Sequence, residues 1–401
     1  MINQLLFILG REQAISAEEL YAVFGLDKVE VLNSSCCLVQ SQDQPEELIK
    51  RLGGTVKIVA YSGSVPRIEE LTADQWLKLL KPLGLKASGK FTFGVSSYGW
   101  KQISNRWFKL GLEVKKLLGQ SGISARFVTS KEDTLSSVIV AKNKLLGSEL
   151  IVIKADDQKI HYGLTQAVQP FEAYGQRDYG KPARDSERGM LAPKLAQVLI
   201  NLAAVSRQKV ILDPFCGTGT VLQEALLLGY RQVIGSDSDS LAITAAKKNL
   251  EWLAKENKLG QYKLIQADVR NIFEQIKPGE VQAVVTEPYL GPARELAGRV
   301  QDGRRKEIVA QLTNLYLQAF EQFNKILPSG GRVVMIWPVF IQEERKIYLP
   351  LMEKIEASGF VRTIPAVVNS SLAQYLTPRK TLIYQRPGQV VTREITVWHK
   401  Q

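Results

Sequence analysis

The stretch Lys209–Thr220, KVILDPFCGTGT, decides the fold of this 401-residue chain. An apolar strand over residues 210–213 runs into a turn that contains two glycines, and a helix is expected over residues 221–228. Glycine lets the backbone turn sharply and lets a ligand approach the main chain. The helix that follows offers unpaired N–H groups and the positive end of its dipole. The turn therefore predicts a ligand site, but it matches neither GxGxxG nor the P-loop, which disfavours NAD and ATP.

Outward from this turn, strands and helices alternate along the C-terminal half. Strands are expected over residues 232–237, 262–268, 281–289 and 331–339, and helices over residues 194–204, 241–255 and 308–327. Strict alternation of this kind predicts a doubly wound parallel sheet. Open sheets of this class bind ligands at the carboxyl ends of their strands.

Two acidic residues occupy such strand ends. Asp237 ends the strand after the glycine turn, 24 residues beyond Asp213, and a carboxylate there can accept both ribose hydroxyls of an adenosine. Asp268 ends the third strand, where it can meet the adenine amino group. If only one such acid were present, a loop acid or a helix cap before Leu241 would be the better interpretation. The ordered set of turn, acid and acid favours a nucleoside site.

The N-terminal half mixes short strands and helices, which is an α+β pattern. Strands are expected over residues 3–9, 30–39, 55–65, 91–98, 125–129, 138–141 and 150–154, and helices over residues 16–24, 69–83 and 105–118. Ser16 is the expected N-cap of the first helix. Residues 169–189 break the periodicity and mark the domain junction.

Charge is distributed unevenly within the N-terminal half. The net charge is +12, and residues 51–150 hold 16 basic against 7 acidic side chains, whereas residues 1–50 hold 3 against 8. This distribution fits a basic face for a polyanion such as nucleic acid, and equally a solvated lysine-rich helix. Three cysteines and two histidines give no metal site, and a reducing cytoplasmic compartment is expected. No apolar run approaches the ~18 residues of a membrane span.

The motifs Leu212–Thr220 (LDPFCGTGT), Gly235–Asp239 (GSDSD) and Gln266–Asp268 (QAD) resemble those of class I S-adenosylmethionine-dependent methyltransferases. Residues 177–203, RDYGKPARDSERGMLAPKLAQVLINLA, narrow the resemblance to the THUMP-domain tRNA guanosine-10 N2-methyltransferase family of archaea and eukaryotes. More loosely, residues 5–25, 91–99 and 162–182 resemble its RNA-binding first half.

The resemblance implies an α/β, Rossmann-like class I methyltransferase domain preceded by an α+β ferredoxin-like and THUMP RNA-binding region. We expect a ferredoxin-like region over residues 1–55 and a THUMP-like domain over residues 56–168. A linker over residues 169–185 then leads to the methyltransferase domain over residues 186–401. The expected partner is tRNA, with no membrane. A small activating subunit stays open, because the residues give no signal for one.

The resemblance also implies residues for the cofactor S-adenosylmethionine: Asp213, Phe215, Cys216, Gly217, Gly219, Asp237, Ser238, Asp268 and Val269. Asp213 and the turn would hold the methionine end, Asp237 the ribose and Asp268 the adenine. Cys216 is more simply a small packing residue than a nucleophile, since nothing in the sequence supplies a base beside it.

The fourth strand of this half carries the catalytic candidates Thr286, Glu287, Pro288 and Tyr289. Amino-methylating relatives end this strand with Asp, Asn or Ser, then two prolines and an aromatic. There, a side-chain oxygen and a backbone carbonyl accept the amine protons while the aromatic stacks on the base. Here Thr286 replaces the acceptor and Glu287 the first proline. Three interpretations follow: Glu287 supplies the acceptor, the Thr286 hydroxyl and Glu287 carbonyl suffice, or the site is weakened.

The resulting hypothesis is methyl transfer to the exocyclic N2 amine of a tRNA guanosine, with position 10 implied by the resemblance alone. Two alternatives remain from the sequence. One is a DNA amino-methyltransferase, which shares the catalytic architecture but not the THUMP-like first half. The other is a catalytically weakened RNA-binding protein that retains cofactor binding, motivated by the altered Thr286–Tyr289 motif.

Overall fold

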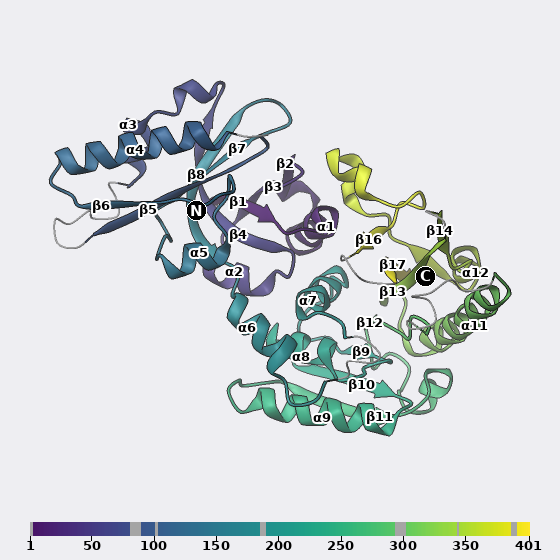
Figure 1. Ribbon diagram of the computed structural model, residues 1–401. Helices are drawn as coiled ribbons and strands as arrows, with labels where there is room; N and C mark the ends of the chain where they lie inside the picture. Colours follow the sequence, from purple (N-terminus) through teal and green to yellow (C-terminus); the bar gives the residue numbers. More distant parts are fainter. Residues whose placement is uncertain are drawn as a thin grey trace. The chain divides into compact units, whose positions relative to one another are not determined.

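The computed structural model describes residues 3–80, 90–100, 103–184, 190–292, 302–342, 345–385 and 391–401. The chain forms two compact units, whose elements are labelled in Figure 1. The first is Met1–Phe171, with which Asn369–Leu372 is grouped, and the second is Glu172–Val368 with Ala373–Gln401. Each unit is built on its own sheet.

The first unit is an eight-stranded sheet, within the described residues, in the order β2-β3-β1-β4-β8-β7-β5-β6. The strands are β1 (Asn3–Leu9), β2 (Val29–Asn33), β3 (Cys36–Ser41), β4 (Thr55–Val65), β5 (Phe91–Tyr98), β6 (Ala125–Val128), β7 (Glu149–Lys154) and β8 (Ile160–Val168). Because β4 pairs with both β1 and β8, one sheet runs through the expected ranges 1–55 and 56–168. The α+β character expected for this half is confirmed.

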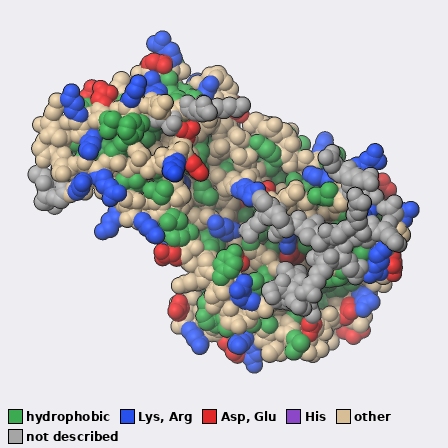
Figure 2. Space-filling view, in the orientation of Figure 1, with side chains coloured by type: hydrophobic (Ala, Val, Ile, Leu, Met, Phe, Trp, Pro, Cys, Tyr) green, Lys and Arg blue, Asp and Glu red, His purple; other side chains and the backbone are tan. Residues whose placement is uncertain are grey.

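The helices of the first unit are α1 (Gln13–Phe24), α2 (Pro45–Arg51), α3 (Ala73–Leu80), α4 (Ser104–Gln120) and α5 (Ser137–Lys142), with short 3-10 turns η1 (Leu26–Lys28) and η2 (Ile68–Glu70). The exposed face of α4 carries Lys109, Lys115 and Lys116. Figure 2 shows lysine and arginine side chains spread over the visible face of this unit. The basic excess of residues 51–150 is therefore a surface property.

The centre of the first sheet holds a buried ion pair. Lys57 on β4 donates to Glu149 on β7 at 2.5 Å, and both side chains are almost fully buried. Ser96 and Thr165 donate to the two oxygens of the same carboxylate, each at 2.6 Å. With four strands meeting at one carboxylate, this network fixes the register of β4, β5, β7 and β8.

Three local expectations in this half are wrong. Residues 30–39 are not one strand but the hairpin β2–β3, because the Asn33 side chain accepts from Ser35 N at 2.7 Å and forms a tight turn. Ser16 is not an N-cap; it lies inside α1, where its hydroxyl donates to Glu12 O at 2.9 Å. Residues 138–141 are helical, since Ser136 caps α5 by accepting from Ile139 N.

The second unit confirms the Rossmann-like α/β domain. Within the described residues its sheet has the order β11-β10-β9-β12-β13-β17-β15, parallel from β11 to β13. These strands are β9 (Ile211–Asp213), β10 (Gln232–Asp237), β11 (Gln261–Gln266), β12 (Ala283–Thr286), β13 (Arg332–Gln342), β15 (Phe360–Arg362) and β17 (Thr392–Lys400), with β14 (Arg345–Tyr348) and β16 (Leu382–Tyr384) paired at the side. Strand β17 is antiparallel to both of its neighbours on this path.

Helices cover this sheet. They are α6 (Phe171–Gly175), α7 (Pro193–Leu202), α8 (Thr220–Leu227), α9 (Ser240–Ala254), α11 (Asp302–Ile326) and α12 (Met352–Ala357), with a π-helical turn η4 (Gln176–Gly180) and 3-10 turns η5 (Val269–Glu274), η6 (Ala366–Asn369) and η7 (Ser371–Tyr375). Within the described residues, no helix is both long and apolar enough to cross a bilayer. The expected linker is thus partly helical, over residues 171–180.

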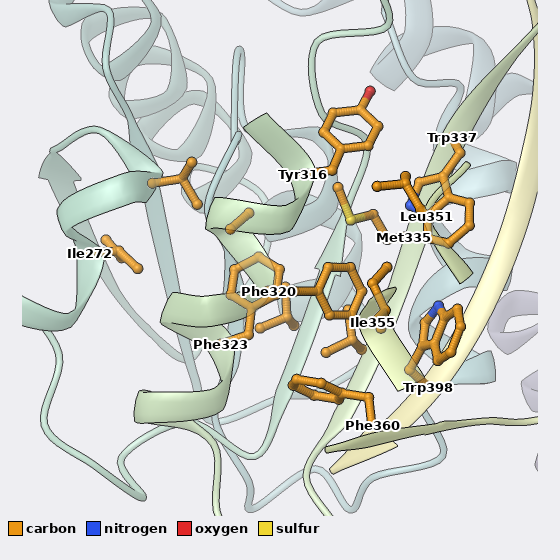
Figure 3. Packing of buried hydrophobic residues seen from close by; sticks show 14 of the residues in the cluster. Ile272, Tyr316, Phe320, Phe323, Met335, Trp337, Leu351, Ile355, Phe360 and Trp398 are labelled. Carbon is orange, nitrogen blue, oxygen red and sulfur yellow. The ribbon is translucent and has the colours of Figure 1, made fainter. Parts of the chain in front are cut away.

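One aromatic core joins α11 to the sheet. Phe320 on α11 lies 5.2 Å from Phe360 on β15 and 6.1 Å from Trp398 on β17, as ring centroid distances. Figure 3 shows these rings packed with Phe323 from the next turn of the same helix. Burying such large side chains stabilises this half by roughly 1.5–3 kcal/mol for each. The core fixes α11 and β17 against the strands whose ends form the site.

Candidate active site

Asp213 ends β9 and is 2% exposed. Its Oδ1 accepts from the Thr286 hydroxyl at 2.6 Å and from Phe215 N at 3.2 Å. Burial raises the pKa of Asp213 to about 7; those two donors oppose the shift, and the negative charges of Asp237 and Glu287 add to it. A carboxylate in this state gains from any cation brought beside it.

The glycine turn follows directly. Gly217 and Gly219 have φ values of 50° and 83°, a region in which side chains are strained. A Cβ on Gly219 would lie 3.2 Å from that of Ala246 on α9, whereas one on Gly217 would meet nothing within 4 Å. Gly219 therefore packs the turn on α9, and Gly217 presents its backbone to open space.

Asp237 joins the turn to the next strand. Its Oδ2 accepts from Gly217 N and its Oδ1 from Asp239 N, both at 3.0 Å. Asp237 is half-buried at the end of β10, and Ser238 after it is exposed. Asp239 is the N-cap of α9 and accepts from Leu241 N at 2.9 Å. The sequence left open whether the acids before Leu241 are helix caps or ligand-binding residues. In the structure Asp239 is the helix cap, whereas Asp237 is oriented by two backbone donors.

Asp268 follows β11 and caps η5. Its carboxylate accepts from the backbone and side chain of Arg270, at 2.6–2.9 Å. These contacts, the side-chain one above all, hold the pKa of Asp268 below its usual range. Val269 beside it is 3% exposed and belongs to the core. The structure therefore brings Asp268 to the same sheet edge as Asp237, but pairs it with Arg270.

The motif Thr286–Tyr289 lies at the end of β12, next to β9 in the sheet. Thr286 is fully buried, and Pro288 is buried too. Glu287 accepts from Arg393 Nε at 2.5 Å, with side chains 12% and 10% exposed. Tyr289 is 53% exposed. The end of β12 thus points one hydroxyl inward to Asp213 and presents one aromatic ring to solvent.

Four residues that the sequence did not single out support this arrangement. Arg393 on β17 holds Glu287, and the Tyr316 hydroxyl on α11 donates to Tyr289 O at 2.7 Å. Lys181 is 3% exposed and donates to the hydroxyls of Thr218 and Thr220 at 3.3 and 3.0 Å. Asn249 on α9 donates to Thr218 O at 2.9 Å. Of these four residues, only Lys181 lies within a stretch that the sequence analysis quoted, residues 177–203. Asn249, Tyr316 and Arg393 lie outside the quoted motifs.

Cys216 is 4% exposed inside the turn, and burial raises the pKa of its thiol well above the usual value. It is a packing residue, since a buried neutral thiol is a poor nucleophile. Across the part of the chain that the structure describes, no group of three or more His, Cys, Asp or Glu side chains is placed to hold a metal.

Comparison with known proteins gives a consistent picture. Residues 181–348 match the UPF0020 family, described as an RMKL-like methyltransferase domain. A tRNA (guanine(10)-N2)-dimethyltransferase of Methanothermobacter thermautotrophicus is 31% identical over 159 residues, which are 40% of this chain and 42% of that protein. The match thus spans less than half of that relative.

A second relative, from Methanothermococcus thermolithotrophicus, bears the name "Probable tRNA (guanine(10)-N2)-dimethyltransferase". It is 32% identical over 110 residues, which are 27% of this chain and 67% of that protein. Among solved structures, TrmN from Thermus thermophilus has a TM-score of 0.54 at 19% identity and covers 99% of this chain and 100% of its own. This likeness shows a shared fold over both units.

Proposed function

The chain belongs to the UPF0020 family of RMKL-like methyltransferases, and from this premise we propose that it methylates the N2 amine of a guanosine in tRNA with S-adenosylmethionine. One observation carries the proposal. Asp213 and Asp237 end the neighbouring parallel strands β9 and β10, and Asp268 lies two residues beyond the next strand, β11. The glycine turn after Asp213 has an open backbone at Gly217, whose N–H donates to Asp237. A fourth strand end beside them carries an exposed tyrosine.

The residues present fit the cofactor. Asp213 with the turn Phe215–Gly219 would hold the methionine end, where a neighbouring ammonium would favour the ionised form of this buried acid. Asp237, already oriented by two backbone donors, would accept the ribose hydroxyls beside Ser238. Asp268 and Val269 would flank the adenine, with Arg270 yielding one of its contacts to Asp268. When bound, the cofactor supplies an electrophilic methyl group.

The strand end would position the target amine. Tyr289 would stack on an extruded guanine, and the Glu287 carbonyl and carboxylate would accept the amine protons beside Pro288. Arg393 fixes the orientation of that carboxylate, and Tyr316 fixes the backbone at Tyr289. Methyl transfer to nitrogen depends on such positioning more than on a strong base.

Thr286 receives a different role from the one its position suggested. Its hydroxyl donates to Asp213 and its side chain has no exposed surface. We therefore assign Thr286 to orienting the carboxylate of Asp213, the residue proposed to hold the methionine end of the cofactor. Of the three interpretations of the altered motif, this favours Glu287 as the amine acceptor.

For the remaining regions, we propose a ferredoxin-like region over residues 1–55 and a THUMP-like RNA-binding domain over residues 56–168. Residues 169–185 would link them to the methyltransferase domain over residues 186–401. The basic surface of α4 supports RNA binding by the first unit. A cytoplasmic location follows from a tRNA substrate. Whether the enzyme needs a small activating subunit is tested by measuring the activity of the purified protein alone.

Transfer of labelled methyl groups to unmodified tRNA, with duplex DNA in parallel, tests this function. We expect N2-methylguanosine in digested tRNA and no label in DNA. Label in DNA alone would replace the proposal with the DNA-directed alternative. Cofactor binding without transfer to tRNA would instead favour the weakened RNA-binding protein.

A further inference from the structure

An open groove lies in the second unit, and none of its described lining residues belongs to the candidate site. It has a volume of about 650 Å³ and lies between α11, β14 and α12. Its apolar lining comes from Val309, Ala310, Leu317, Ile347 and Pro350, and Thr313 and Asn314 add polar atoms. The volume falls within the ~300–1,000 Å³ of small-molecule sites, which suits one extruded nucleotide.

The rim of this groove is cationic. Arg305 and Lys306 on α11 and Lys354 on α12 line it, and no carboxylate is found among its described lining residues. Both lysine side chains are exposed. Neighbouring acids exist, since Glu307 pairs with Arg304 and Glu353 precedes Lys354, but they lie outside the lining. An apolar floor below a positive rim matches a base below its phosphates.

The groove and the proposed target site share helix α11. Tyr316, whose hydroxyl donates to Tyr289 O, stands on α11 between the groove residues Thr313 and Leu317. One helix therefore bounds the groove and supports the ring proposed to stack on the target base. A polynucleotide that places one base on Tyr289 is thus brought to the same helix.

We propose that this groove is a second RNA-binding subsite, which takes an unpaired nucleotide of the tRNA substrate near the target guanosine. The inference rests on the proposed function. The base lies on Val309, Leu317 and Ile347, and the flanking phosphates contact Lys306 and Lys354. The positive rim favours a polyanion over an apolar protein segment.

The test measures tRNA binding by fluorescence anisotropy across a range of salt concentrations, with the full-length protein. Lys306→Glu combined with Lys354→Glu should weaken binding at least tenfold. The slope of log affinity against log salt should flatten by about 0.7–0.9 for each lost phosphate contact. Lys248→Glu combined with Lys258→Glu, at exposed positions on and after α9, is the matched charge control. Equal weakening by both pairs overturns the subsite, because it would reflect net charge alone.

A second pair of variants tests the apolar floor. Ala310→Trp fills the groove, whereas Gln311→Trp places the same bulk on the next, exposed residue of α11 outside it. We expect weaker tRNA binding in the first only, with cofactor binding unchanged in both. The subsite is wrong if Ala310→Trp and the Lys306→Glu/Lys354→Glu variant both bind tRNA like wild type. If wild type still methylates tRNA in that case, the proposed function stands. If wild type binds but never methylates tRNA, the proposed function fails on its own.

Discussion

Asp213 shows how one residue sets a balance between stability and binding. Its pKa of about 7 in the folded state exceeds the 3.8 of an unperturbed carboxyl, so its ionisation opposes folding. The penalty is absent below pH 4, grows between pH 4 and pH 7, and is complete above pH 7. Three pKa units correspond to roughly 4 kcal/mol, and this figure already includes the opposing hydrogen bonds from Thr286 and Phe215.

Asp213→Asn should therefore be more stable than wild type at pH 8 and closer to it at pH 4. The amide oxygen can still accept from Thr286 and Phe215 N, so the local fold is retained. Urea unfolding of both proteins at the two pH values measures this difference. Parallel stability profiles for wild type and variant would show that Asp213 does not carry the penalty.

Asp237→Ala should weaken binding of S-adenosylmethionine by more than tenfold, because two charge-assisted hydrogen bonds to the ribose are lost. Wild-type affinity is expected in the micromolar range, about −8 kcal/mol. Titration calorimetry gives the comparison. Asp239→Ala is the control, since that residue caps α9 and has no proposed ligand. Tight binding by Asp237→Ala would remove the ribose assignment.

Tyr289→Ala should lower turnover while cofactor affinity stays nearly unchanged. Loss of one stacking partner is worth ~1–3 kcal/mol, or roughly tenfold to over a hundredfold in rate. Tyr289→Phe keeps the ring and should retain most activity. Single-turnover rates on unmodified tRNA separate the two variants. Equal rates for Ala and Phe would place the base elsewhere.

For single residues, the sequence predicted where the site residues lie along the strands better than it predicted which side chains they contact. Asp213 and Asp237 end their strands as expected, because each follows a buried apolar run. The expected strand end at Asp268 is wrong by two residues, since β11 ends at Gln266 and its residues are exposed or half-buried. The partner of Thr286 was not predictable, since Asp213 lies 73 residues away. The same holds for Glu287 and Arg393, which are 106 residues apart.

Among the elements, β12 and β17 are coupled by the Glu287–Arg393 pair. Breaking a mostly buried ion pair costs about 3–5 kcal/mol when one charge is left unpaired. Glu287→Gln and Arg393→Gln should each destabilise the protein, and the double variant should lose less than their sum. Chemical denaturation of all four proteins gives the coupling energy. Strict additivity would mean that the pair does not connect these strands.

Thr286→Asp tests the same strand end from its inner side. A second carboxylate would face Asp213 in a buried setting, where like charges repel strongly. We expect lower stability and weaker cofactor binding, not a gain in methylation rate. Thr286→Val, which keeps the shape, is the control for packing. A faster Thr286→Asp enzyme would show that this residue faces the substrate amine after all.

Elements of the second unit were predictable where apolar runs alternate with amphipathic ones, as from β9 to β13. The strands after residue 342 were missed, and β17 in particular completes the sheet from a distant part of the chain. In the first unit, residues 138–141 look like a strand in isolation, yet the cap at Ser136 makes them a helix. Short apolar runs do not distinguish the two states.

At the scale of the molecule, the first unit is expected to carry much of the affinity for RNA. Changing Lys109, Lys115 and Lys116 on α4 to glutamate in the full chain should weaken tRNA binding and flatten its salt dependence. Cofactor affinity should not change, because these residues lie in the other unit. Unchanged tRNA binding by a folded triple variant would move the RNA surface away from α4.

The two-part organisation was visible in the sequence as a change from an irregular to an alternating pattern. The single sheet of the first unit was not, because the chain order of its strands differs from their order in space. Non-local pairing of this kind leaves no periodic signal in the residues that make it.

The central claim is methyl transfer to the N2 amine of a tRNA guanosine, and nucleoside mass spectrometry of unmodified tRNA treated with enzyme and isotope-labelled S-adenosylmethionine tests it most directly. The account predicts labelled N2-methylguanosine with wild type, little with Tyr289→Ala, and none with Asp237→Ala at low cofactor concentration. Label on any other nucleoside, or no label from a wild-type protein that binds both cofactor and tRNA, would contradict it.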